Sequence, residues 1–219
     1  MSFLTPDLIL VQSASVLKKL STFGCWVKLV PSGVDLERFH PIIEERKLGL
    51  WSKYGVDADK FAILHVGHRN RNIQILKELQ RDNNKVLVVG STSTEQDEDL
   101  VDELRIAGVR VVTTYFQNID EIYQLSDCYV FPVTSETASI EVPLSVLEAM
   151  ACNLPVVTTR YGGLPTMFNG EGNELFFVEK LKDLSNKVEK VKKFNHSETR
   201  RMIEPYSWGE VAKRILELL

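Results

Sequence analysis

Three carboxylates surround the start of one expected helix in the segment from Phe131 to Val157. Glu136 and Glu141 precede the helix, and Glu148 lies one turn inside it. Carboxylates accept hydrogen bonds from ribose or sugar hydroxyls, and free N–H groups at a helix start can hold a phosphate. The segment therefore fits a site for a sugar joined to a phosphate. It fits equally well an ordinary βαβ unit with solvated acids.

A basic loop follows an apolar run earlier in the chain. It runs from Gly67 through His68, Arg69, Asn70 and Arg71 to Asn72. Guanidinium forks bind phosphate oxygens in a bidentate manner, and a glycine lets the backbone approach a ligand closely. We therefore expect Gly67, His68, Arg69 and Arg71 to bind a diphosphate, in preference to the hypothesis that the arginines are solvated residues at a helix start.

Two further groups are candidates for contacts to a nucleotide. Tyr115 follows the run VRVV, where an aromatic ring can stack on a base or pack in the core. Pro143, Leu144 and Ser145 open the helix that carries Glu148, so we expect their backbone to lie against the phosphate. Pro143 itself supplies no N–H donor.

Strand-like and helix-like segments alternate along the chain and must position these groups. The expected strands are continuous and β-branched, as in parallel strands covered on both faces. They span Leu8–Val11, Val27–Val30, Ala62–Val66, Val86–Val89, Val109–Val112, Cys128–Phe131, Pro155–Thr158 and Leu175–Val178. The expected helices span Ala14–Phe23, Glu44–Tyr54, Asn72–Gln80, Asp97–Ala107, Ile119–Leu125 and Leu144–Cys152, with two more in the tail at 181–194 and Trp208–Leu219. This order predicts an α/β fold with a Rossmann-like doubly wound parallel sheet.

Glycines end several of the expected strands. Gly67, Gly90 and the pair Gly162-Gly163 each follow an apolar run. Such glycines either make tight turns or admit a ligand close to the backbone. Because doubly wound sheets bind ligands at the carboxyl ends of their strands, the set favours a site at this edge.

The composition fits a globular protein and excludes several classes. The 219 residues carry a formal net charge of -4, so we expect no nucleic-acid partner. Apolar runs are shorter than the ~20 residues of a membrane span. GxGxxG, Walker A, HExxH and GxSxG motifs do not occur. We expect Cys25, Cys128 and Cys152 to be buried thiols in the cytoplasm, and the lysines of 181–194 to be a solvated face more readily than a membrane face.

Five ordered motifs resemble the C-terminal, donor-binding domain of GT-B glycosyltransferases of family 4, also called group 1. VPSGVDLERFHP is similar to the family's interdomain segment, and ILHVGHRNRNIQIL is similar to its phosphate loop. LSDCYVFPVTSE and VLEAMACNLPVVTTRYGGLP resemble the two motifs that follow, and YSWGEVAKRILELL resembles the closing segment. The resemblance runs from about Leu29 to the end of the chain and implies the C-terminal half of a GT-B fold.

The resemblance also implies roles for the candidate residues. Arg69 and Arg71 match the basic pair on the donor diphosphate, with Arg71 where lysine is usual. Glu148 matches the second glutamate of the family's E-x7-E motif, which holds the ribose. Glu136 and Glu141 would lie at the donor sugar, and Arg69, Arg71 and Glu141 would be the catalytic residues.

This chain departs from the family pattern at the sugar end of the motif. Ile140 stands eight places before Glu148, where the first glutamate is expected, and Glu141 comes one residue late. Pro143 also replaces a glycine. The diphosphate and ribose assignments are unaffected by these changes, whereas Glu141 would need a reshaped loop to reach the sugar.

The implied enzyme transfers a hexose from UDP- or GDP-hexose, a substrate and not a cofactor, to a cell-surface glycan or lipid with retention and without a metal. Residues 1–30 would be a remnant of the N-terminal domain and the linker. Residues 31–205 would bind the nucleotide-sugar, and 206–219 would cross back to the missing domain, located in the same gene or a partner chain. We expect a cytoplasmic protein that is inactive alone and reaches the inner face of the membrane through its acceptor.

Two rival hypotheses remain. A UDP-sugar epimerase shares the GT-B architecture, although the LEAMA-like stretch disfavours it. A non-catalytic nucleotide-binding module with a decayed sugar site is favoured by Ile140 and Pro143.

Overall fold

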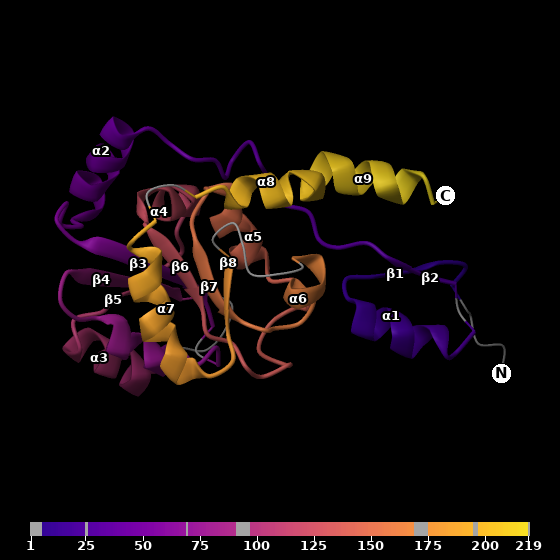
Figure 1. Ribbon diagram of the computed structural model, residues 1–219, viewed down its shortest axis with the longest axis horizontal. Coiled ribbons are helices and arrows are strands. Elements are labelled where there is room, and N and C mark those ends of the chain that lie inside the picture. The colour runs from indigo at the N-terminus through magenta and orange to yellow at the C-terminus, as the bar shows by residue number, and fades with distance from the viewer. Residues whose placement is uncertain are drawn as a thin grey trace.

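The computed structural model describes residues 6–24, 26–68, 70–90, 97–168, 175–194 and 197–218. Within them, a six-stranded sheet and a two-stranded sheet organise the chain. The large sheet lies between layers of helices, and the small sheet lies toward the other end of an elongated molecule, where both termini also lie (Figure 1).

The six-stranded sheet is parallel throughout, with the order β5-β4-β3-β6-β7-β8. Its strands are β3 (Phe61–Gly67), β4 (Asn84–Gly90), β5 (Arg110–Val112), β6 (Cys128–Phe131), β7 (Val156–Thr159) and β8 (Leu175–Val178). The chain runs outward from β3 to β5 and then returns to place β6 on the other side of β3. The predicted doubly wound parallel sheet is confirmed, and its topological switch point lies between β3 and β6.

Helices on both faces of this sheet enclose two apolar cores. The first core includes buried residues of α2 (Glu44–Tyr54), α4 (Ile119–Leu125), α5 (Leu144–Ala151) and α8 (Thr199–Ile203). The second includes those of η1 (Ile73–Leu79), α3 (Glu98–Ile106) and α7 (Leu184–Val191). Short helices α6 (Leu164–Met167), η2 (Leu181–Asp183) and η3 (Glu204–Tyr206) complete the set. Successive residues of β3 alternate between the cores, because Leu64 faces the first and Ile63 the second.

The segment after β3 differs from the prediction of an α-helix over Asn72–Gln80. It is a 3₁₀-helix over Ile73–Leu79, preceded by Asn72 in the left-handed conformation with φ 56°. Ile73, Leu76 and Leu79 recur every third residue and are all buried. Because side chains three residues apart align on a 3₁₀-helix, this spacing buries one stripe that an α-helix would spread over a wider face.

The two-stranded sheet belongs to a separate N-terminal unit of β1 (Ile9–Val11), α1 (Ala14–Ser21) and β2 (Val27–Leu29). Its strands are parallel, with Ile9 opposite Val27, and no third strand of the described residues joins them. Leu10 and Leu29 are about two-fifths exposed, and Trp26 is more exposed still. Parallel strands are normally covered on both faces, so this unit leaves unusual apolar surface open.

The linker after β2 is braced by the segment that leads into α9 (Trp208–Leu216). Val34 N–H donates to Tyr206 O at 2.9 Å, and Trp208 N–H donates to Val34 O at 3.2 Å. Gly33 lies directly under the Trp208 ring, since a Cβ there would be 2.7 Å from Trp208 Cε3. The two stretches of chain that leave the sheet domain are therefore hydrogen-bonded to each other.

Three other expectations from the sequence can be compared with the structure. Cys128 and Cys152 are buried free thiols, and Cys25 lies outside the described residues. None of the helices in the described ranges is long and apolar enough to cross a bilayer. The same ranges contain no group of three or more His, Cys, Asp or Glu side chains able to hold a metal ion.

Candidate functional site

A hollow of about 610 Å³ opens where the carboxyl ends of β3 and β6 meet. This volume falls within the range of small-molecule sites, and the location is the switch point of the sheet. The hollow is lined by Val66, Gly67, His68, Asn70, Arg71, Thr137, Ala138, Ser139, Ile140, Leu144 and Ser145. It therefore collects the end of β3, the loop after β6 and the start of α5.

Arg71 crosses this hollow and joins its two walls. Its guanidinium donates to Val66 O at 3.0 Å, to Ala138 O at 3.3 Å and to Ser139 Oγ at 3.1 Å. Gly67 makes room for it, because a Cβ at position 67 would lie 2.6 Å from Arg71 Cδ. All three acceptors are neutral, so the described contacts leave the positive charge of Arg71 uncompensated.

The charge of the hollow comes from this arginine. Among the described lining residues, Arg71 is the one permanently charged side chain, and no acid is present. Burial lowers the pKa of His68, and the charge of Arg71 lowers it further. His68 is therefore neutral at pH 7, and the hollow has a net positive character suited to an anion.

His65 lies beneath the hollow inside β3. It is fully buried, and its Nδ1 lies 2.9 Å from Val130 O. Burial lowers the pKa of His65 to about 3, with a further contribution from the charge of Arg71. The ring is neutral at physiological pH and donates to the neighbouring strand through Nδ1.

The start of α5 supplies two backbone donors. The first hydrogen bonds of this turn run from Val146 N–H and Leu147 N–H to Pro143 O, at 3.1 and 3.4 Å. The N–H groups of Leu144 and Ser145 have no acceptor among the described residues, and both residues line the hollow. Pro143 makes no side-chain cap. Two free donors and a helix dipole thus face the same space as Arg71.

The loop after β6 is held in place by residues that follow the neighbouring strands β3 and β7. Asn72 donates to Thr134 Oγ1 at 2.8 Å, and Tyr161 Oη donates to Ser139 O at 2.6 Å. In this fixed loop Glu136 is exposed and Glu141 is partly buried. Neither glutamate lines the hollow, whereas Ile140 does.

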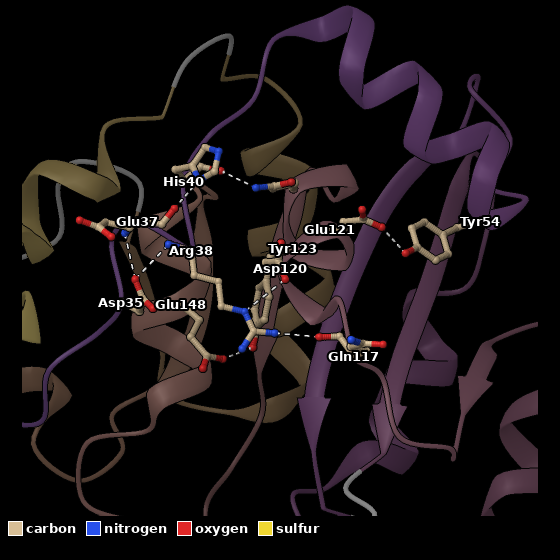
Figure 2. Close-up of polar contacts among 11 residues, drawn as sticks. Asp35, Glu37, Arg38, His40, Tyr54, Gln117, Asp120, Glu121, Tyr123 and Glu148 are labelled. Carbon is tan, nitrogen blue, oxygen red and sulfur yellow. Dashed lines mark hydrogen bonds and ion pairs between the residues drawn. The ribbon is translucent and has the colours of Figure 1, made fainter.

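Glu148 lies one turn further along α5, outside the lining of the hollow. Its Oε2 accepts a hydrogen bond from Tyr123 Oη of α4 at 2.7 Å (Figure 2). Burial raises the pKa of Glu148, while the Tyr123 hydrogen bond and the charge of Arg38 oppose that rise. Tyr123 is itself buried, which raises its pKa well above the ordinary value and keeps it a donor.

Of the other predicted contacts, Tyr115 is not among the residues that line the hollow. Tyr115 follows β5 and is 79% exposed, so it does not pack in the core. Its neighbour Phe116 packs there instead, with its ring 5.5 Å from that of Tyr54. Arg69 lies outside the described residues.

Several residues of this region were not predicted from the sequence. Asn70 and the stretch Thr137–Ser139 line the hollow, and Tyr123 holds Glu148. The 137–139 stretch meets Arg71 across 67 positions of the chain, and no local pattern signals such a contact. Because Tyr123 lies in an apolar helix, the sequence predicts a core residue, and its ring does lie in the first core.

The family of the chain follows from its sequence. The profile of the family described as Glycosyl transferases group 1 matches residues 63–193, a range that contains β3, the hollow and α5. The chain belongs to this family. Sulfoquinovosyl transferase SQD2 from Arabidopsis thaliana is 29% identical over 95% of this chain but only 43% of its own length.

Solved structures share the fold over nearly the whole chain. Anabaena HepE, solved in complex with UDP-glucose, aligns with a TM-score of 0.78 at 18% identity, over 97% of this chain and 63% of HepE. The C-terminal domain of the group 1 protein LpcC from Francisella tularensis aligns with a TM-score of 0.57 at 19% identity, over 84% of this chain and 98% of that domain. The fold is that of the C-terminal half of a GT-B glycosyltransferase, and the chain spans less than two-thirds of SQD2 and HepE.

Proposed function

We propose that this chain is the donor-binding half of a retaining glycosyltransferase and that the hollow holds the diphosphate of a nucleotide-sugar. The observation that carries this proposal is the combination of Arg71 with the free N–H groups of Leu144 and Ser145. A guanidinium bound only to neutral acceptors and a helix start without a cap both favour a negatively charged ligand. Gly67, His68 and Arg69 would complete the phosphate contacts.

Glu148 would bind the ribose of the same donor. A carboxylate held by one tyrosine through Oε2 still has acceptor capacity for the two hydroxyls of a ribose. Glu148 lies one turn along α5 from the helix start. In a nucleotide whose diphosphate lies at the helix start, the ribose would lie beside this position. Tyr115, exposed after β5, is the proposed contact for the base.

The donor sugar would project toward the loop that carries Glu136 and Glu141. In the proposed reaction the acceptor oxygen attacks the anomeric carbon from the face that the diphosphate leaves, and the hydroxyl proton passes to the departing phosphate oxygen. Arg69 and Arg71 stabilise the charge of the diphosphate. Glu141 has its backbone fixed by Gly163 N–H, which donates to Glu141 O at 2.8 Å. Its side chain would reach the sugar from this anchored position.

Acceptor binding is proposed to need another half, in the same gene or a partner chain. The open strands β1 and β2, with Leu10, Trp26 and Leu29 exposed, give such a half a surface to cover. Residues 1–30 and 206–219 would belong to this junction, and 31–205 to the donor domain. The full enzyme would act in the cytoplasm on a glycan or lipid acceptor, with a hexose donor, and this chain alone would transfer little.

Titration calorimetry with UDP, GDP and ADP tests the donor site directly. UDP is the first choice because the similar HepE was solved with UDP-glucose. We expect weak binding of at least one diphosphate and a large loss in Arg71→Met. A folded protein that binds none of the three would overturn the proposal.

Ile140 supports one alternative, a nucleotide-binding module whose sugar site has decayed. An isoleucine that is half-exposed in the hollow offers no hydrogen bond to a sugar at the place of the family's first glutamate. Comparison of UDP with UDP-glucose separates the two functions. Equal affinities, together with unchanged affinity in Glu141→Gln, favour the module, whereas tighter binding of the sugar nucleotide favours the enzyme.

A further inference from the structure

Arg38 lies between β2 and α2, inside the interdomain motif VPSGVDLERFHP, where no role was assigned to it, and its backbone is fixed by a local turn. Asp35 Oδ1 accepts from the N–H groups of Glu37 and Arg38, both at 3.0 Å. Phe39 N–H donates to Asp35 O at 3.0 Å. This turn directs the side chain of Arg38 away from the linker and toward α4 (Figure 2).

Two contacts anchor the guanidinium at the start of α4. Arg38 Nε donates to Asp120 Oδ1 at 3.2 Å, and Nη2 donates to Gln117 O at 2.9 Å. The side chain remains 45% exposed. The anchors explain where the guanidinium lies, but an exposed ion pair of this kind contributes little stability.

The anchored guanidinium lies beside the carboxylate proposed to hold the ribose. Figure 2 shows Arg38 reaching to the pair of Tyr123 and Glu148 from the side of Gln117 and Asp120. The Phe39 ring packs edge-on against Tyr123 at 5.5 Å, and Arg38 Cζ lies 5.4 Å from the Phe39 ring centroid. The linker thus contributes one side of the surroundings of Glu148.

We propose that Arg38 is a positioning residue for nucleotide binding, which keeps Glu148 ionised and oriented toward the ribose diol. This inference rests on the proposed donor site and adds to it a residue from the linker. Tyr123 fixes one carboxylate oxygen by a hydrogen bond, and the positive charge of Arg38, which lies beside Tyr123, favours the ionised carboxylate (Figure 2). The contact between Glu148 and the ribose would then depend on the packing of the linker against α4.

The groups around Glu148 make Arg38 the one to test. Tyr123 faces it from α4, Tyr129 from β6 and Cys152 from its own helix. Burial raises the pKa of all three, that of Tyr129 to about 12, so they stay neutral between pH 5 and 8. Arg38, paired with Asp120, therefore supplies the positive charge beside Glu148, and its removal should raise the pKa of Glu148.

The experiment compares UDP with 2′,3′-dideoxy-UDP by calorimetry from pH 5.5 to 8. We expect Arg38→Gln to weaken UDP roughly two- to fivefold, by the usual size of an exposed charge interaction, and to leave dideoxy-UDP unchanged. The loss should grow toward low pH, because a Glu148 with a higher pKa becomes protonated earlier. Arg38→Lys, which keeps the charge without the fork, should recover part of the loss.

Arg105→Gln is the matched control. Arg105 on α3 is 48% exposed and pairs with Asp102 at 3.3 Å. The Arg105→Gln variant therefore loses a comparable ion pair away from the hollow. We expect no change in UDP affinity or in its pH profile. A double variant of Arg38→Gln with Glu148→Gln should bind UDP no more weakly than Glu148→Gln alone.

A measurement without ligand keeps this inference separate from the donor proposal. The ¹³C shift of the Glu148 carboxyl, assigned through Glu148→Gln, should titrate at a higher pH in Arg38→Gln than in the wild type. An unchanged titration, or equal losses for UDP and dideoxy-UDP, would overturn the role of Arg38. Failure of the wild type to bind UDP, GDP and ADP would overturn the donor site and this role together.

Discussion

Two arginines flank α5, and they differ in what holds them. Arg71 donates to two carbonyls and a hydroxyl, whereas Arg38 donates to the carboxylate of Asp120 and one carbonyl. An arginine bound by dipoles is oriented but keeps its full charge for a ligand. One bound to a carboxylate is largely neutralised and can only bias its neighbours. The same side chain can therefore serve as an anion receptor or as a local regulator of a carboxylate.

The largest effect expected from this difference is on diphosphate binding by Arg71→Met. Removal of two charge-assisted hydrogen bonds, at about 1.5 kcal/mol each, should weaken UDP about 100-fold. The same change should lower the free energy of unfolding by about 1–3 kcal/mol, because Ala138 O loses the Arg71 donor and Val66 O keeps Tyr129 Oη but loses Arg71. Calorimetry and urea unfolding measure both. An Arg71→Met affinity close to that of the wild type would contradict the assignment of the receptor role.

The reach of the Arg71 charge can be measured through His65. Because burial lowers the folded-state pKa of His65 to about 3, the unfolded state binds more protons between pH 3 and 6.5. The contribution of His65 to stability is therefore lost as the pH falls, by about 2 kcal/mol between pH 7 and pH 5. Urea unfolding of the wild type and of His65→Val should differ by this pH dependence.

Arg71→Met serves as the second arm of that measurement. Without the nearby positive charge the pKa of His65 should rise, so the loss of stability with falling pH should level off at a higher pH than in the wild type. An identical pH dependence in the wild type and His65→Val would show that His65 does not carry the effect.

Glu148→Gln should weaken UDP about tenfold, the usual size of one lost hydrogen bond to a charged group. The loss should vanish for dideoxy-UDP, because the diol that Glu148 binds is absent. In the wild type, UDP affinity should fall as the pH is lowered toward the raised pKa of Glu148, and Glu148→Gln should lack this dependence. Equal losses for both nucleotides would place Glu148 outside the ribose site.

The smallest and most specific change is Asp120→Asn, which turns Arg38 into an arginine with neutral partners, like Arg71. The stronger field at Glu148 should lower its pKa and increase UDP affinity at pH 6 by about twofold. Calorimetry at pH 6 and pH 8 measures the difference. A loss of affinity equal to that of Arg38→Gln would instead mean that Asp120 matters for holding Arg38 in place.

The fold was predictable from the sequence because its information is local. Continuous β-branched runs such as Ala62–Val66 and Val86–Val89 lie within the observed β3 and β4, and Gly67 and Gly90 end both strands. The helix type at Ile73–Leu79 was missed, although its apolar residues recur every third position, which is the period of a 3₁₀-helix. The three-residue spacing is visible in the sequence, but the segment also fits the more common α-helix.

The site was predictable in composition but not in geometry. Gly67, His68, Arg71, Leu144 and Ser145 line the hollow as the motifs suggested. The acceptors of Arg71 lie 67 and 68 positions away, and Asp120 lies 82 positions from Arg38. Contacts between residues so far apart in the sequence depend on the conformations of loops in the folded protein. Local propensity and hydrophobic periodicity do not predict these conformations.

The brace between Gly33 and Trp208 has a mechanical consequence. Both stretches of chain that leave the sheet domain pass through the Val34–Ser207 bridge, so neither can twist without the other. Rotation of one stretch against the other would therefore break these hydrogen bonds, which couples the N-terminal unit to α9. A single methyl group at position 33 would push the Trp208 ring away and weaken that coupling.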